Sequence, residues 1–142
     1  MERALLNLKE IKQFATECAK ELRGGEVIAL IGELGAGKTT FTKELLKAKG
    51  VRKRITSPTF GLIAEYKVGK KDFYHVDLYR IGSLKEFTAL GISQTWQQPN
   101  STYIIEWADK ISRILPKGTI IIRFSHSSES NPNQRKISIS TK

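Results

Sequence analysis

A run of glycines followed by a lysine and a threonine has the composition of a phosphate-binding loop. Residues 32–40 read GELGAGKTT, in which Gly32, Gly37, Lys38 and Thr39 fit the pattern G-x-x-x-x-G-K-[ST]. Glycines let a loop turn its backbone N–H groups toward phosphate oxygens, because no side chain stands in the way. The lysine supplies a positive charge for the β- and γ-phosphates, and the threonine hydroxyl is an oxygen ligand for Mg²⁺. The pattern predicts a P-loop.

The segments on either side of this loop are those that a P-loop requires. Residues 27–31, VIALI, form a short continuous apolar run, which is typical of a strand buried on both faces. A helical stretch follows from about Lys38 to Lys49, and Gly50 ends it. By chance, the four fixed positions of the motif occur in well under ~1% of chains of this length. The residues expected to bind the nucleotide through the loop are Gly32, Glu33, Leu34, Gly35, Ala36, Gly37, Lys38, Thr39 and Thr40.

A P-loop also needs a carboxylate near its metal and a group that positions the attacking water or acceptor. Glu106 ends the apolar run TYII, where a metal-binding acid is expected; alternatively, the dipole of a following helix favours an acid there. Asp77 ends the run FYHVD, and in a strand His75 faces the same way. The two could act together, or His75 could be an ordinary half-buried strand residue. The Glu33 side chain is expected to point outward, because facing the phosphates would be electrostatically unfavourable.

The rest of the chain alternates between helical and strand-like patterns. Residues 7–23 read as an amphipathic helix, and both Asn7 with Glu10 and Ser83 with Glu86 have the spacing of a capping box. Helices interleaved with buried strands predict an α/β sheet with antiparallel additions in the middle and at the end. The further strands are predicted at residues 60–68, 73–77, 102–106, 119–124 and 135–141, and further helical segments at about 83–90 and 107–115.

Composition restricts the class of protein. A length of 142 residues suits one domain over residues 1–142. The 24 Lys and Arg exceed the 14 Asp and Glu by 10, which excludes a strongly acidic type and favours a polyanionic partner such as RNA, nucleotide or an acidic protein face. A single cysteine excludes a disulfide framework and a multi-Cys zinc site. Because the sequence shows neither a long apolar run nor a secretory signal, we expect a cytoplasmic protein.

Four segments occur together in an order and spacing that is specific to one family. They are Gly32–Thr40 (GELGAGKTT), Ser57–Phe60 (SPTF), His75–Arg80 (HVDLYR) and Ile105–Trp107 (IEW). On these segments the chain resembles the bacterial TsaE (YjeE) family of P-loop ATPases. That family supports threonylcarbamoylation of adenosine 37 in tRNAs that read ANN codons. The resemblance extends over nearly the whole chain.

The resemblance implies a small P-loop NTPase-type fold of three layers, with a central, mostly parallel sheet that includes antiparallel strands and has helices on its faces. It implies that ATP and Mg²⁺ are the cofactors. By motif position, Lys38 contacts phosphates, Thr39 and Glu106 hold Mg²⁺, and Asp77 has a catalytic or switch role. The catalytic residues implied are therefore Lys38, Asp77 and Glu106.

The resemblance also implies how the nucleotide is covered and which proteins act with this one. Trp107 is expected close to the nucleotide, and the segment Ser57–Phe60 over it. The implied partners are TsaB and TsaD, whose tRNA-modifying complex is reset by ATP hydrolysis. The basic segment Lys47–Arg54 could contact tRNA or an acidic partner surface, or it could be a solvated face with cations matched to the helix dipole.

Two other functions remain open from the sequence. The first is a nucleotide-gated binding module, in which hydrolysis is vestigial and ATP locks a partner interface. The second is a small-molecule kinase, because many small P-loop proteins transfer phosphate to a hydroxyl. The kinase ranks lower, because the chain lacks an arginine-rich lid after the sheet, with Arg113 as the one candidate there.

Overall fold

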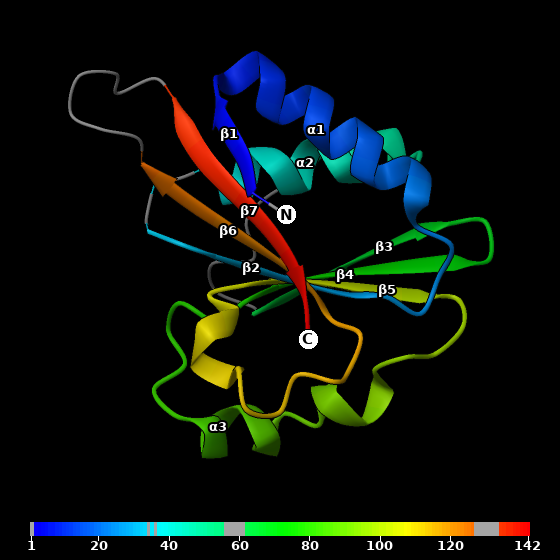
Figure 1. Cartoon of the computed structure of the whole chain (residues 1–142). Helices are drawn as coiled ribbons and strands as arrows, with labels where there is room; N and C mark the ends of the chain where they lie inside the picture. Colours follow the sequence, from blue (N-terminus) through cyan, green and yellow to red (C-terminus); the bar gives the residue numbers. More distant parts are fainter. Residues whose placement is uncertain (1, 34, 36, 56–61, 127–133) are drawn as a thin grey trace.

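The computed structural model contains one seven-stranded sheet between two layers of helices (Figure 1). It describes residues 2–33, 35, 37–55, 62–126 and 134–142. The strands are β1 (Glu2–Leu6), β2 (Val27–Gly32), β3 (Ile63–Val68), β4 (Lys71–Asp77), β5 (Ser101–Glu106), β6 (Ile120–His126) and β7 (Arg135–Thr141). The α-helices are α1 (Leu8–Glu21), α2 (Lys38–Ala48) and α3 (Leu84–Ala89), and 3₁₀ helices span Ile92–Thr95 and Ala108–Ile111.

The sheet has a parallel centre and antiparallel edges. Its strand order is β1-β7-β6-β2-β5-β4-β3, and the four central strands β6, β2, β5 and β4 run parallel. β3 pairs antiparallel with β4 on one side, and β7 and β1 add antiparallel strands on the other. The predicted α/β fold is confirmed. Because parallel strands share a direction, the carboxyl ends of β2, β4, β5 and β6 all meet at one edge of the sheet.

β2 is buried on both faces, as its apolar run predicts. Ile28 and Leu30 point into the core under α1 and α2, whereas Val27 and Ala29 point into the core on the α3 side. This alternation follows from the two-residue period of a strand. Figure 1 shows α1 and α2 on one side of the sheet, and α3 with the 3₁₀ segments on the other.

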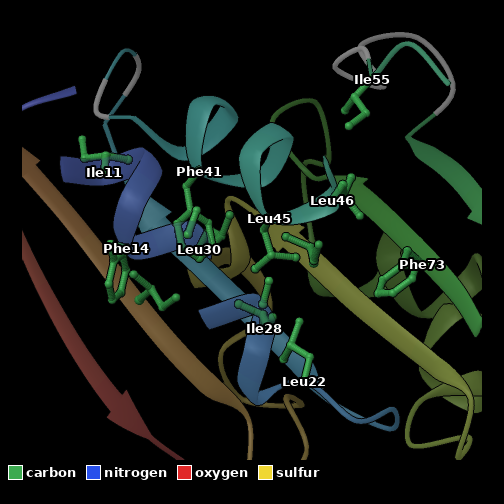
Figure 2. Close-up of a cluster of buried hydrophobic side chains, with 14 of the residues drawn as sticks. Ile11, Phe14, Leu22, Ile28, Leu30, Phe41, Leu45, Leu46, Ile55 and Phe73 are labelled. Atoms are coloured by element: carbon green, nitrogen blue, oxygen red, sulfur yellow. The ribbon is translucent and has the colours of Figure 1, made fainter. Parts of the chain in front are cut away.

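Aromatic side chains fix α2 on the sheet. Phe41 of α2 lies between Phe14 of α1 and Phe124 of β6, with ring-centroid distances of 5.5 and 5.7 Å. Figure 2 shows Phe14 and Phe41 among the buried side chains of this core. Since Phe41 is fully buried and one helical turn beyond Lys38, this packing sets where the first turn of α2 stands.

Most predicted elements are present, with two corrections. The capping box at Asn7 and Glu10 is confirmed in full. At α3, Ser83 does accept the N–H of Glu86, but the Glu86 carboxylate accepts the N–H of Gly82 instead of that of Ser83, so only half of the box forms. β1 was not predicted, because an edge strand is stabilised by its partner, and β1 pairs with β7 from the opposite end of the chain. No helix in the described ranges is both long and apolar enough to cross a membrane.

Candidate nucleotide and metal site

The site lies where the parallel strands end. Gly32 ends β2, Asp77 ends β4 and Glu106 ends β5, and Asp77 and Glu106 are paired in register. β2 lies next to β5, which lies next to β4. In open α/β sheets this edge is where ligands bind. Three segments that are far apart in the sequence therefore present their polar residues to one place.

The P-loop joins β2 directly to α2. Gly37 adopts a left-handed conformation, with φ 105°, as the N-cap of α2. No described side chain caps this helix end, so the N–H groups of its first turn stay available to a ligand. A helix N-terminus with free N–H groups favours an anion. Leu34 and Ala36 of the predicted loop lie outside the described residues, as does the segment Ser57–Phe60.

Gly32 is required by a close approach of two strands. A Cβ atom built at Gly32 would lie 2.5 Å from the carbonyl oxygen of Phe124 on the neighbouring strand β6. That separation is well inside van der Waals contact, so any larger residue would push β2 and β6 apart. The first glycine of the motif thus fixes the position at which the chain leaves the sheet.

Lys38 is buried in the site. The residue is 4% exposed, and Nζ donates a hydrogen bond to the carbonyl oxygen of Gly32. Nζ also lies 3.6 Å from the centroid of the Trp107 ring, a favourable position for a cation. Burial lowers the pKa of Lys38, while nearby carboxylates act to raise it. The opposing carboxylates are those of Glu106, Asp109 and Asp77.

Thr39 and Glu106 provide two oxygens suited to a shared Mg²⁺. The Thr39 hydroxyl donates to Oε1 of Glu106, with 3.3 Å between the two oxygens, although the residues are 67 positions apart. Two adjacent ligands of an octahedral Mg²⁺, each about 2.1 Å from the ion, stand about 3 Å apart. The described residues contain no group of three or more His, Cys, Asp or Glu that would hold a metal.

His75 contacts Glu106. The ring is fully buried, and its Nε2 lies 2.5 Å from Oε2 of Glu106. Asp77 is half-buried, and its Oδ1 accepts the N–H of Tyr79 at 2.9 Å. His75 is therefore fully buried, not half-buried, and Glu106 is its hydrogen-bond partner. The predicted alternation along β4 is confirmed, and the hydrogen-bond partner of His75 belongs to the neighbouring strand β5.

The residue after Glu106 has an unusual backbone. Trp107 has φ 60° and ψ 35°, in the left-handed region that bulky residues rarely adopt. Its half-buried ring lies 5.2 Å from the Tyr79 ring and faces Lys38. The strained turn places the indole at the strand end beside the P-loop.

A cavity of about 720 Å³ opens beside the P-loop, within the usual size range of small-molecule sites. Gly32, Glu33 and Trp107 line it, together with Asp109 and residues of β6. Glu33 is exposed, as expected, but it still contributes to the cavity wall.

Sequence reasoning missed two contributors to the site. Arg135, at the start of β7, donates from Nη2 to the carbonyl oxygen of Gly35 at 3.3 Å. Asp109 lines the cavity, and its negative charge acts to raise the pKa of Lys38. Arg135 sits in an alternating strand pattern, so no local signal marks it. Asp109 follows the IEW segment by two residues, and this proximity was the one signal available.

Some of the cations in the predicted basic segment, Lys47–Arg54, already have partners within the protein. Lys49 donates to the carbonyl oxygen of Leu22 at 3.0 Å, and Lys47 lies 3.8 Å from the carboxylate of Glu44. The remaining cations, Arg52, Lys53 and Arg54, are exposed.

Comparison with known proteins identifies a family that the chain matches. The model described as "Threonylcarbamoyl adenosine biosynthesis protein TsaE" matches residues 5–137. A Treponema pallidum protein named "tRNA threonylcarbamoyladenosine biosynthesis protein TsaE" is 37% identical over 114 residues, which cover 80% of this chain and 83% of that one. A Rickettsia prowazekii protein of the same name is 40% identical over 108 residues, covering 75% and 74%. The crystal structure of Bacillus subtilis YdiB has a TM-score of 0.71 at 30% identity, covering 99% of this chain and 87% of YdiB.

Proposed function

Because this chain belongs to the TsaE family of threonylcarbamoyl adenosine biosynthesis proteins, we propose that it binds and hydrolyses ATP with Mg²⁺. In this role it supports threonylcarbamoylation of adenosine 37 in tRNAs that read ANN codons. The observation that carries the proposal is the 3.3 Å approach of the Thr39 hydroxyl to the Glu106 carboxylate, next to a buried lysine and an uncapped helix N-terminus.

Each group has a role that follows from its chemistry. The N–H groups at the start of α2 and the Lys38 ammonium bind phosphate oxygens, and Lys38 stabilises the charge that develops on the transferred group. Thr39 and Glu106 hold Mg²⁺, which when bound neutralises charge on the β- and γ-phosphates. Asp77 orients the attacking water or acts as the switch that reports the state of the nucleotide. Trp107 lines the cavity of about 720 Å³ beside the P-loop, which is the proposed nucleotide site.

Phosphate release by the purified protein, alone and with TsaB and TsaD, tests this function. Replacing Lys38 by Ala should lower the rate by about two to three orders of magnitude, the usual loss when one charge-stabilising donor is removed. Lys85→Ala is the matched control, because it removes the same charge from an exposed position on α3. Turnover no greater than that of the Lys38→Ala variant in both settings would reject ATPase activity and favour a nucleotide-gated binding module.

We propose TsaB and TsaD as protein partners and the cytoplasm, where tRNA is modified, as the location. The exposed cations of the loop after α2 are the candidate contact with tRNA. Arg52 and Lys53 line a cavity of about 370 Å³ whose other wall is formed by Glu65, Tyr66 and Lys67 of β3. Phosphate contacts make affinity fall steeply with salt.

The tRNA contact can be tested by tRNA binding at several salt concentrations. The wild type should lose affinity as salt rises, and a variant with Arg52, Lys53 and Arg54 replaced by Gln should bind less tightly, with a smaller salt dependence. A flat response in the wild type would reject direct tRNA contact and leave an acidic protein face as the partner of this loop.

A further inference from the structure

We infer that His75 is a positioning residue: through its Nε2–H it fixes the orientation of the Glu106 carboxylate, so that Oε1 faces Thr39 and the metal site. This inference rests on the proposed function, because it assigns His75 a task in metal binding. It extends that function to a residue two positions from Asp77 that touches neither phosphate nor metal in the proposed arrangement.

The two oxygens of Glu106 contact two different side chains. Oε1 accepts from the Thr39 hydroxyl at 3.3 Å, and Oε2 lies 2.5 Å from Nε2 of His75. Glu106 is 3% exposed and His75 fully buried, so water has little access to either group. The final side-chain torsion of a glutamate has a broad energy profile, so the side chain alone does not fix the plane of its carboxylate. Hydrogen bonds must therefore supply that restraint.

The position of His75 in the sheet lets it restrain the Glu106 carboxylate. β4 and β5 pair in parallel, with Asp77 opposite Glu106, so His75 and Glu106 point to the same face of the sheet. Phe73 of β4 and Ile104 of β5 on that face belong to the core that packs against α2. The imidazole is thus fully buried next to this core, and its Nε2 lies within hydrogen-bond distance of the carboxylate. Hydrogen-bonded partners of this kind usually orient the ligands of protein metal sites.

The structure also selects one tautomer of His75. Within the described residues, Nδ1 is buried and has no hydrogen-bond partner. A hydrogen on Nδ1 would be an unpaired buried donor, and the bare Nε2 would then face a carboxylate oxygen. A hydrogen on Nε2 instead donates to the carboxylate, giving a charge-assisted bond. Of the two neutral tautomers, the one with its hydrogen on Nε2 therefore fits these contacts.

The first test is metal-independent. Nitrogen-15 NMR of the metal-free full chain, with His75→Gln used to assign the signal, should show a hydrogen on Nε2 of His75. A bare Nε2 would overturn the inference, whatever the protein does with nucleotides.

The second test measures how much Mn²⁺ strengthens binding of a β,γ-imido ATP analogue, as the ratio of affinities with Mn²⁺ and with EDTA. His75→Met should lower this ratio by about 10- to 100-fold, with the affinity in EDTA unchanged. His75→Gln, which can place an amide N–H near the position of Nε2, should restore most of the ratio. In a Glu106→Gln background, His75→Met should have no further effect, because His75 acts through Glu106.

The outcomes separate this inference from the proposed function. A wild type that binds the analogue equally with and without Mn²⁺ would reject the proposed metal site. A wild type that needs Mn²⁺, with a His75→Met variant that unfolds cooperatively and keeps the full ratio, would reject only the role of His75. Equal losses of this affinity ratio in His75→Met and His75→Gln would also reject the role of His75. They would indicate that the imidazole contributes only by packing and not by its hydrogen bond.

Discussion

The ammonium group of Lys38 lies over the indole ring of Trp107, with Nζ 3.6 Å from the ring centroid, and it donates to the carbonyl oxygen of Gly32. The lysine that is proposed to bind phosphate is thus already paired with groups of the protein. Trp107 reaches it from a left-handed backbone conformation, which costs about 1–2 kcal/mol. Phosphate must therefore compete with the ring and the carbonyl, and the site holds its cation in place before the ligand arrives.

The buried charge of Lys38 predicts a dependence of stability on pH. Burial lowers its pKa below the usual 10.5. Between the lowered value and 10.5, the unfolded chain binds a proton that the folded chain has released, so the contribution of Lys38 to stability rises with pH. Urea denaturation should therefore show the free energy of unfolding of the wild type increasing, relative to that of Lys38→Met, from neutral pH toward 10.5. A constant or decreasing difference would contradict the pKa shift.

Glu106→Gln should separate metal use from nucleotide binding. The amide keeps the size of the side chain but loses the negative charge that Mg²⁺ prefers. We expect the Mg²⁺ concentration for half-maximal turnover to rise at least about tenfold, while nucleotide affinity in EDTA falls only slightly. Glu21→Gln, at an exposed position at the end of α1, is the control. Full activity at unchanged Mg²⁺ would show that Glu106 is not a metal ligand.

Gly32→Ala should abolish nucleotide binding through backbone displacement. The added Cβ would meet the Phe124 carbonyl oxygen at 2.5 Å, so β2 or β6 must shift where the P-loop begins. Gly69→Ala is the comparison, because Gly69 also has a positive φ but has no atom within 4 Å of an added Cβ. Calorimetry with ATP analogue should show binding lost in Gly32→Ala and kept in Gly69→Ala. Normal binding by a folded Gly32→Ala protein would contradict the packing argument.

Arg135→Met should loosen the P-loop. The guanidinium donates to the carbonyl oxygen of Gly35 at 3.3 Å, a hydrogen bond that restrains the backbone of the P-loop. Loss of one hydrogen bond from a charged donor predicts about tenfold weaker nucleotide binding, with Arg135→Lys intermediate. Arg113→Met removes an exposed arginine and should leave the affinity unchanged. Equal affinities for all three variants would show that this contact is not used.

Local patterns predict the strand-loop-helix unit that carries the P-loop, and β2 and α2 confirm that unit. Gly32 and Lys38 belong to one strand-loop-helix unit, whose apolar run, glycines and helical period are read within about 20 residues. The polar ends of β4 and β5 were recognised by the same means, because an acid that closes an apolar run stands out. Local spacing also placed His75 and Asp77 on one face of β4. It carried no information about the strand next to them.

Tertiary structure decided which of these residues meet. The strand order brings Glu106 to Thr39 across 67 positions, and Arg135 to Gly35 across 100. The register of β4 with β5 places His75 next to Glu106. The pairing of β1 with β7 makes β1 an edge strand, which no local sequence period indicated. Strand neighbours and register depend on side-chain packing between distant segments, and the period of a single strand is the same whichever neighbour it has.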